Sequence, residues 1–365
     1  MKKLLSLYNT PLKSLKFIDR KFSITSPKTL IIGSDGSGKT SLVIDHLKQF
    51  KDDEILYINL QDIRINEAKI LDDLEQFLKD NAAIKALAIE GVNSNEQAVV
   101  IEKFSSLDLQ NIIVTSESKN INLNGFKKLN LSYLDYEEFI AFFPKNLDQD
   151  QLFSHFVTHG NSLNSAFLDQ SEVVENLQAR LKSKLNEADI NLMKECAAFQ
   201  GANLSAHELY KNLKTHSKTS KDRVYAGLVE LENRGFISLV AKFEQPSAAK
   251  RLYFNDFAMR NALSLKKDFV KLFSNIVFCE LFKFKEEIFY TKEFDFFLAK
   301  RKLAILCIPF SDSDLIFLKF KKLHANLKAL GVNKLQVISV ANQAELSMEG
   351  IKCEILPFSR WALSF

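Results

Sequence analysis

Apolar and polar positions alternate in blocks along the first third of the chain, and the pattern predicts strands separated by helices. Four short apolar runs, rich in β-branched residues, are typical of buried strands and occupy residues 30–32, 55–60, 87–89 and 112–115. Strands that alternate with helices in this way predict a parallel sheet covered by helices. In such sheets ligands bind at the carboxyl ends of the strands.

A second block, residues 186–255, predicts three short helices followed by a hairpin. The second of these helices opens with Ser205 and has Glu208 three positions later, which is the pattern of a capping box. The third places Val224, Leu228 and Leu231 on one face. Three short helices and a hairpin with a turn near residues 245–247 predict a winged helix.

Composition narrows the class of protein. The 365 residues suffice for two or three domains, and 46% hydrophobic and 26% charged residues are typical of a globular protein. No apolar run reaches the roughly 18 residues that a membrane span needs, so we expect no membrane partner and a cytoplasmic protein. The four cysteines are far apart, which disfavours a zinc site or a disulfide framework; they are Cys196, Cys279, Cys307 and Cys353.

The stretch between the first predicted strand and the following helix is a candidate phosphate-binding loop. Its glycines and its lysine fit the phosphate-loop pattern G-x-x-x-x-G-K-[ST]. Glycines let main-chain N–H groups converge on phosphate oxygens, and the helix N-terminus adds unpaired donors. Lys39 would reach the terminal phosphates of ATP, and the Thr40 hydroxyl would ligate Mg²⁺. The predicted nucleotide-binding residues are Gly33, Ser34, Asp35, Gly36, Ser37, Gly38, Lys39, Thr40 and Ser41.

The carboxylates that hydrolysis needs are incomplete. An ATPase of this kind usually ends a second strand in Asp-Glu, whereas this chain has Glu90 followed by Gly91. If Glu90 holds Mg²⁺, the attacking water has no base, and if Glu90 is the catalytic base, the metal lacks its aspartate. Glu96 could substitute only through an unusual loop path. Thr115 ends the next predicted strand, where a residue that senses the terminal phosphate would lie.

Six further stretches, in this order along the chain, resemble a known family. They are "KKLNLSYLDYEEFIAFF", "VTHGNSLNSAF", "AKRLYFNDFAMRNAL", "NIVFCEL", "FYTKEFDFFLA" and "CEILPFSRWAL". Together with the loop they are similar to AAA+ ATPases of the archaeal-ATPase-like group. The resemblance implies an α/β protein with a P-loop AAA+ parallel-sheet core, a winged-helix middle domain and a restriction-endonuclease-like α/β C-terminal domain. We expect the core over 1–132, a helical lid over 133–185, the winged helix over 186–262 and the nuclease-like domain over 263–365.

The chain also departs from the family pattern. The family usually has Gly-Pro-Arg early in the loop, where this chain has Gly33-Ser34-Asp35. It usually has Gly-Arg after the sensor strand, where only Lys127 or Lys128 could stand in. Lysine cannot copy the bidentate contact of an arginine. Each departure weakens hydrolysis more than binding.

The middle and C-terminal domains offer further candidate sites. Basic residues at the start of the third helix and on the wing form a candidate phosphate-contacting face for DNA; they are Lys218, Lys221, Arg223, Lys250 and Arg251. A solvated surface or a rigid spacer is the alternative. In the nuclease-like domain Glu280 and Asp295 match two catalytic acids, with Glu293 beside them. Cys307 and Pro309 stand where the remaining Glu and Lys are expected, so nuclease activity is not expected.

Three functions follow from these patterns. The first is an ATP-binding AAA+-type protein in which nucleotide acts mainly as a conformational switch, with weak or absent hydrolysis and a protein partner at the C-terminal domain. The second is an active ATPase that uses Glu90 and a residue from a neighbouring subunit. The third is a DNA-binding regulatory protein in which the loop is structural.

Overall fold

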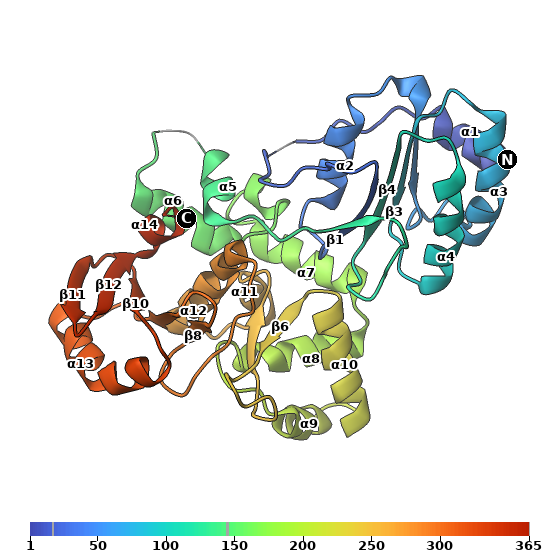
Figure 1. Cartoon of the computed structure of the whole chain (residues 1–365). Coiled ribbons are helices and arrows are strands. Elements are labelled where there is room, and N and C mark those ends of the chain that lie inside the picture. Colours follow the sequence, from blue (N-terminus) through green and yellow to red (C-terminus); the bar gives the residue numbers. More distant parts are fainter. Residues whose placement is uncertain (17, 144–145, 365) are drawn as a thin grey trace. The chain divides into compact units, whose positions relative to one another are not determined.

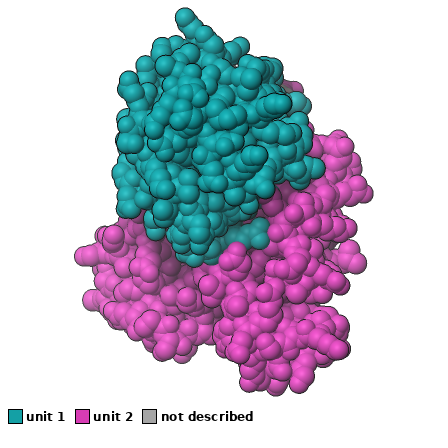
Figure 2. Space-filling model, turned by 90° about the vertical axis from the view of Figure 1, so that its right-hand side faces the viewer, with its two compact units in different colours: residues 1–134, 162–164, 233–235 teal, residues 135–161, 165–232, 236–365 magenta. Residues whose placement is uncertain are grey.

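The computed structural model describes residues 1–16, 18–143 and 146–364, so that Phe365, the end of the last predicted domain, lies outside the described residues. The chain divides into two compact units (Figure 2). The first contains residues 1–134, 162–164 and 233–235, and the second contains residues 135–161, 165–232 and 236–365. No helix among the described residues combines the length and the apolar character that crossing a bilayer requires.

A parallel sheet of five strands forms the centre of the first unit, in the order β2-β3-β4-β1-β5. Its strands are β1 (Lys28–Ile32), β2 (Ile55–Asn59), β3 (Ala86–Glu90), β4 (Asn111–Ser116) and β5 (Lys127–Asn130). Its helices are α1 (Lys2–Tyr8), α2 (Lys39–Leu47), α3 (Glu67–Asp80) and α4 (Asn95–Lys103), with short 3-10 turns η1 (Asp52–Glu54) and η2 (Phe104–Ser106). The four predicted strands are therefore confirmed.

Helices cover both faces of this sheet (Figure 1). On one face, α2 packs Leu42, Val43 and Leu47 against apolar residues of the strands. On the other face, α1, α3 and α4 close a larger core that includes Leu74 and Ile101. The central strands are buried on both sides, which explains why they are almost continuously apolar.

The second unit begins with helices and a hairpin. Its helices up to the hairpin are α5 (Tyr136–Ala141), α6 (Gln149–His159), the 3-10 turn η3 (Ser165–Phe167), α7 (Val173–Lys184), α8 (Glu187–Ala198), α9 (Ala206–Lys214) and α10 (Lys221–Asn233). Strands β6 (Ile237–Val240) and β7 (Arg251–Phe254) pair antiparallel. The Ser205 hydroxyl caps α9 by accepting a hydrogen bond from the Glu208 N–H, which is one of the two bonds of the predicted capping box. Three helices and a hairpin thus lie where the sequence predicts them.

A mixed sheet dominates the remainder of the second unit, in the order β11-β12-β10-β9-β8. The elements are α11 (Met259–Leu263), α12 (Phe269–Glu280), η4 (Leu281–Phe284), β8 (Phe296–Leu298), β9 (Leu303–Cys307), α13 (Ser313–Ala329), β10 (Lys334–Ser339), β11 (Ala344–Met348), β12 (Ile351–Pro357) and α14 (Phe358–Ala362). Strands β9, β10 and β12 run parallel, whereas β8 and β11 are antiparallel to their neighbours. The predicted α/β class, with a parallel-sheet core and a further α/β domain at the C-terminus, is confirmed.

Candidate functional site: the phosphate loop and the strand ends beside it

The loop from Gly33 to Gly38 joins the carboxyl end of β1 to the N-terminus of α2. Gly36 and Gly38 have φ angles of +77° and +90°, a region that favours glycine. A Cβ on Gly33 would lie 2.6 Å from Ser37 Oγ and 2.8 Å from the Leu131 carbonyl oxygen. The glycine positions of the motif therefore follow from backbone geometry.

The Lys39 ammonium lies against the loop itself. It donates hydrogen bonds to the carbonyl oxygens of Gly33 and Ser34, at 2.8 and 2.9 Å. Ser37 Oγ is buried and has no hydrogen-bond partner among the described residues. A polyphosphate in the loop would supply acceptors for both groups, in place of the carbonyl contacts that Lys39 makes.

Glu90, at the end of β3, receives two hydroxyl donors. The Thr40 hydroxyl donates to Glu90 Oε2 at 2.8 Å, and the Tyr57 phenol donates to the same oxygen at 2.9 Å. Burial raises the pKa of the Glu90 carboxyl above its ordinary value, while the two hydroxyl donors and the charge of Lys39 oppose the rise. Burial and the nearby Glu90 charge raise the pKa of Tyr57, which keeps its phenol protonated as a donor.

The donors at this point fit Mg²⁺. Glu90 is 6% exposed, and its second oxygen, Oε1, has no partner among the described residues. A carboxylate and a threonine hydroxyl are the hard oxygen ligands that Mg²⁺ takes beside substrate phosphates. No group of three or more His, Cys, Asp or Glu side chains able to hold a metal occurs among the described residues. A metal at Thr40 and Glu90 would therefore complete its shell with phosphate oxygens and water.

The neighbouring strand ends do not supply a second carboxylate beside Glu90. Gly91 adopts φ +82°, and its N–H donates to the Thr115 hydroxyl at 3.3 Å, so Thr115 lies beside the predicted site. Glu96 lies in the first turn of α4 (Asn95–Lys103), where hydrogen bonds at the start of the helix lower its pKa. The contact between Glu90 and Thr40 favours the metal role of Glu90 over the role of a base.

The outer side of the loop is held by residues that sequence patterns did not identify. The Arg20 guanidinium donates to the carbonyl oxygens of Ser37 and Ser132, at 2.6 and 2.8 Å. The Tyr133 phenol donates to the Asp35 carbonyl oxygen at 2.8 Å. No local signal around Arg20 marks it, because its partners are 17 and 112 residues away.

Two short segments of the first unit also contact the loop. The Leu163 N–H donates to the Gly36 carbonyl oxygen at 3.0 Å, and the Ser34 hydroxyl donates to the Gly235 carbonyl oxygen at 2.9 Å. The chain on either side of residues 162–164 and 233–235 belongs to the second unit. Ser41, the last predicted loop residue, is buried in the first turn of α2.

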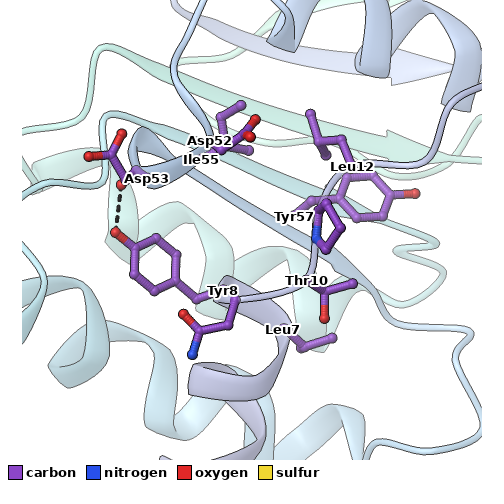
Figure 3. Close-up of a pocket in the computed structure, with 10 residues that line it drawn as sticks. Leu7, Tyr8, Thr10, Leu12, Asp52, Asp53, Ile55 and Tyr57 are labelled. Carbon is purple, nitrogen blue, oxygen red and sulfur yellow. Dashed lines mark hydrogen bonds between the residues drawn. The ribbon is translucent and has the colours of Figure 1, made fainter.

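Tyr57 is a further residue near the site that the sequence patterns did not identify, although they predicted its strand. Its ring lines a cavity of about 270 Å³ between α1, the following residues 9–12 and the start of β2. In Figure 3 the Tyr57 hydroxyl points away from Tyr8, whose own phenol donates to the Asp53 carbonyl oxygen at 2.5 Å. Tyr57 thus has its ring in the cavity wall and its hydroxyl on Glu90.

Lys127 and Lys128 do not replace the missing arginine. They lie on β5, where Lys127 pairs with Thr29 near the amino end of β1 and Lys128 pairs with Leu30 in its middle. Their ammonium groups donate to Thr25 Oγ1 and to the Lys119 carbonyl oxygen. Because these partners lie outside the loop, the structure does not place either ammonium group where the arginine was expected.

The five basic residues of the predicted DNA face differ in their surroundings. Arg223 forms an ion pair with Asp189 at 2.8 Å, and Arg251 lies over the Tyr290 ring at 4.3 Å. Lys218, Lys221 and Lys250 are exposed. The DNA face stays a prediction, with these three exposed lysines as its candidate phosphate contacts.

The predicted nuclease acids have separate structural partners. Glu280 accepts a hydrogen bond from the Tyr136 N–H at 2.6 Å and pairs with Lys283 at 2.7 Å. Asp295 accepts from the Cys307 N–H at 2.8 Å. Pro309 and Glu293 have no described contact with either carboxylate. The contacts assign Glu280 and Asp295 to holding backbone N–H groups.

Comparison with known proteins gives distant structural likenesses. No protein-family model matches the chain, and no curated protein matches it. A Walker-type ATPase of Pyrococcus abyssi is similar over 66% of this chain and 91% of that chain, with 13% identity and a TM-score of 0.46. The ORC1 protein of Aeropyrum pernix, solved in complex with DNA, is similar over 66% of this chain and 87% of that chain, with 12% identity and a TM-score of 0.39. At these low scores we draw no functional conclusion from the likenesses.

Proposed function

We propose that the chain is an ATP-binding protein of AAA+ type that holds MgATP at residues 33–41 and uses it mainly as a conformational ligand. The observation that supports this most is the contact between Thr40 and Glu90, which joins the loop to a buried carboxylate with a free oxygen. The loop main chain would bind the phosphates, Lys39 would neutralise them, and Thr40 with Glu90 would hold the metal. Bound Mg²⁺ would offset the charge of the phosphates.

We expect slow hydrolysis because the site lacks a second carboxylate among the described residues. Gly91 occupies the position that follows Glu90, so no carboxylate stands there to accept a proton from water. A ligand shifts a conformational equilibrium by its differential affinity for the two states, and turnover is not required for that. The contacts of Leu163 and Gly235 with the loop supply a route by which phosphates would affect segments that lead into α7 and β6.

Calorimetry with MgATP tests the binding proposal. We expect heat and a rise in melting temperature for the native chain, because a ligand that binds only the folded state stabilises it by mass action. Lys39→Ala should abolish most of both effects. The matched control is Lys48→Ala at the end of α2, an exposed lysine that pairs with Asp45 rather than with the loop.

The proposed conformational effect of the nucleotide requires a second measurement. Hydrogen exchange with and without MgATP should show altered protection at residues 162–164 and 233–235 in the native chain and no change in Lys39→Ala. Binding without any change in these segments contradicts the switch, and absence of binding at millimolar MgATP contradicts the whole proposal.

A further inference from the structure

The side chain of Gln61 covers Gly91, the residue at which the second carboxylate is missing. A Cβ placed on Gly91 would lie 2.8 Å from Gln61 Cγ, 3.3 Å from Cδ and 3.4 Å from Nε2. Gln61 is exposed, whereas Glu90 beside it in space is buried. An amide group thus lies over the backbone that follows the predicted metal ligand.

Strand pairing fixes this placement. Asn59, the last residue of β2, is opposite Glu90 on β3, and the Leu60 N–H continues the ladder to the Glu90 carbonyl oxygen at 2.9 Å. The Asn59 side chain then accepts from the Gln61 N–H at 3.0 Å, which turns the chain at the strand end. Gln61 therefore sits on the carboxyl edge of the sheet, where ligands of such sheets bind.

We propose that Gln61 positions the attacking water for the slow hydrolysis of ATP in this site. The inference rests on the proposed nucleotide binding. A glutamine amide has a carbonyl oxygen that accepts from water and an NH₂ group that donates to an oxygen. In other P-loop NTPases a glutamine orients the attacking water in this manner.

The chemistry needs no net proton transfer to the amide. The water oxygen forms a bond to the γ-phosphorus while the bond from that phosphorus to the β–γ bridging oxygen breaks. ADP leaves with the electron pair of the broken bond, and the proton of the water passes to a phosphoryl oxygen. Gln61 orients the water and is neither protonated nor deprotonated, which accounts for a rate below that of an enzyme with a carboxylate base.

Nearby polar groups have other contacts. The Glu96 carboxyl engages the start of its own helix, and the Thr115 hydroxyl accepts from the Gly91 N–H. The Tyr57 phenol donates to Glu90. The Gln61 side chain makes contacts of its own as well, and it occupies the volume next to Gly91 that a larger residue there would need.

The test compares turnover with affinity in the full chain. ATP hydrolysis at saturating MgATP and the calorimetric Kd for MgATP are measured for the native chain, Gln61→Ala, Gln61→Glu and Gln76→Ala. Gln76 is an exposed control on α3 whose amide donates to Asp80. We expect Gln61→Ala to lower kcat by at least about tenfold with Kd within about twofold, because only the water loses its position.

Gln61→Glu should retain or exceed the native kcat, because a carboxylate orients water and also accepts its proton. Gln76→Ala should match the native chain. An unchanged kcat in Gln61→Ala, or a native chain that binds MgATP without any turnover, overturns the inference and leaves the proposed function standing. Failure of the native chain to bind MgATP overturns the proposed function first.

Discussion

The Thr40 hydroxyl donates a hydrogen bond to Glu90 Oε2 at 2.8 Å, across the gap between the first turn of α2 and the end of β3. This contact joins a residue of the loop motif to a carboxylate that sequence reasoning could place in either of two roles. The contact supports the proposed metal role of Glu90, and the position after it is a glycine, which offers no base.

Replacing Glu90 should remove most of the benefit that Mg²⁺ gives to nucleotide binding. Glu90→Gln keeps the size and the hydrogen-bond acceptor for Thr40 but removes the negative charge. We expect ATP to bind the variant about equally with Mg²⁺ and with EDTA, whereas the native chain should bind about tenfold more tightly with the metal. Calorimetry under both conditions measures the ratio. An unaltered ratio in the variant contradicts the metal role of Glu90.

Tyr57→Phe removes one of the two hydroxyl donors from the buried Glu90 carboxylate. Because such bonds to charged groups are strong, we expect a loss of about 1–2 kcal/mol in the free energy of unfolding at pH 7. Loss of a donor that lowers the pKa of Glu90 should also move the onset of Mg²⁺-dependent ATP binding to higher pH.

The matched control for Tyr57→Phe is Tyr8→Phe on the other side of the same cavity (Figure 3). The Tyr8 phenol donates to a backbone carbonyl oxygen and not to Glu90. Urea denaturation and binding at several pH values should therefore give no change in the pH profile for Tyr8→Phe. Equal pH profiles for the two variants would mean that the Tyr57 contact has no influence on Glu90.

The sheet of the first unit was predictable because β-branched runs recur with helical segments between them. The edge strand β5 was not, since Leu129 is the one apolar residue among its four, Lys127–Asn130, and the strand is largely exposed. The other edge strand, β2, is apolar and largely buried, and it was predicted.

Contacts across the site were less predictable than the motif. The residues of the loop motif are consecutive in the sequence, so their spacing alone predicts how they lie in the structure. Gln61 lies beside Gly91 because β2 and β3 are adjacent in the sheet, and no local sequence pattern predicts the order of the strands. Arg20 likewise reaches the loop from a segment without periodicity. Tertiary placement, and not residue type, brings Arg20 to the loop and Gln61 to Gly91.

Gly33→Ala tests the packing of the loop. The new methyl group would meet Ser37 Oγ at 2.6 Å and the Leu131 carbonyl oxygen at 2.8 Å, and a backbone atom cannot move aside easily. We expect a loss of about 1–3 kcal/mol in stability, as for other overpacked sites, and weaker ATP binding. Gly125→Ala is the control for affinity: its Cβ would meet no atom within 4 Å, but its φ of +79° makes alanine strained there. This variant should lose stability and retain nucleotide affinity.

The exposed lysines of the helix-and-hairpin region give a prediction for DNA. Replacing Lys218, Lys221 and Lys250 together by alanine should reduce the slope of log affinity against log salt by about three, if each contacts one phosphate. Arg223→Ala should leave the slope unchanged and lower stability, because it removes the ion pair with Asp189. Fluorescence anisotropy with a duplex at several salt concentrations measures the slope. Equal slopes for the native chain and the triple variant contradict this DNA face.

Glu280 should make the stability of the second unit depend on pH. Burial raises its pKa from 4.5 to about 7, although Lys283 lowers it, and the neighbouring Asp135 adds to the rise. The folded chain therefore binds the Glu280 proton more tightly than the unfolded chain does. The stabilisation that results is fully present below pH 4.5 and is lost as the pH rises to about 7.

Glu280→Gln should remove this dependence, because glutamine can still accept from the Tyr136 N–H but does not titrate. One pKa unit corresponds to about 1.4 kcal/mol, so the native chain should lose on the order of 3 kcal/mol relative to the variant across this range. Denaturation between pH 4.5 and 8 measures the difference, with exposed Glu287→Gln as the control for removal of a carboxylate. A constant difference between the native chain and Glu280→Gln would show that Glu280 is ionised throughout, which requires that Lys283 outweighs burial.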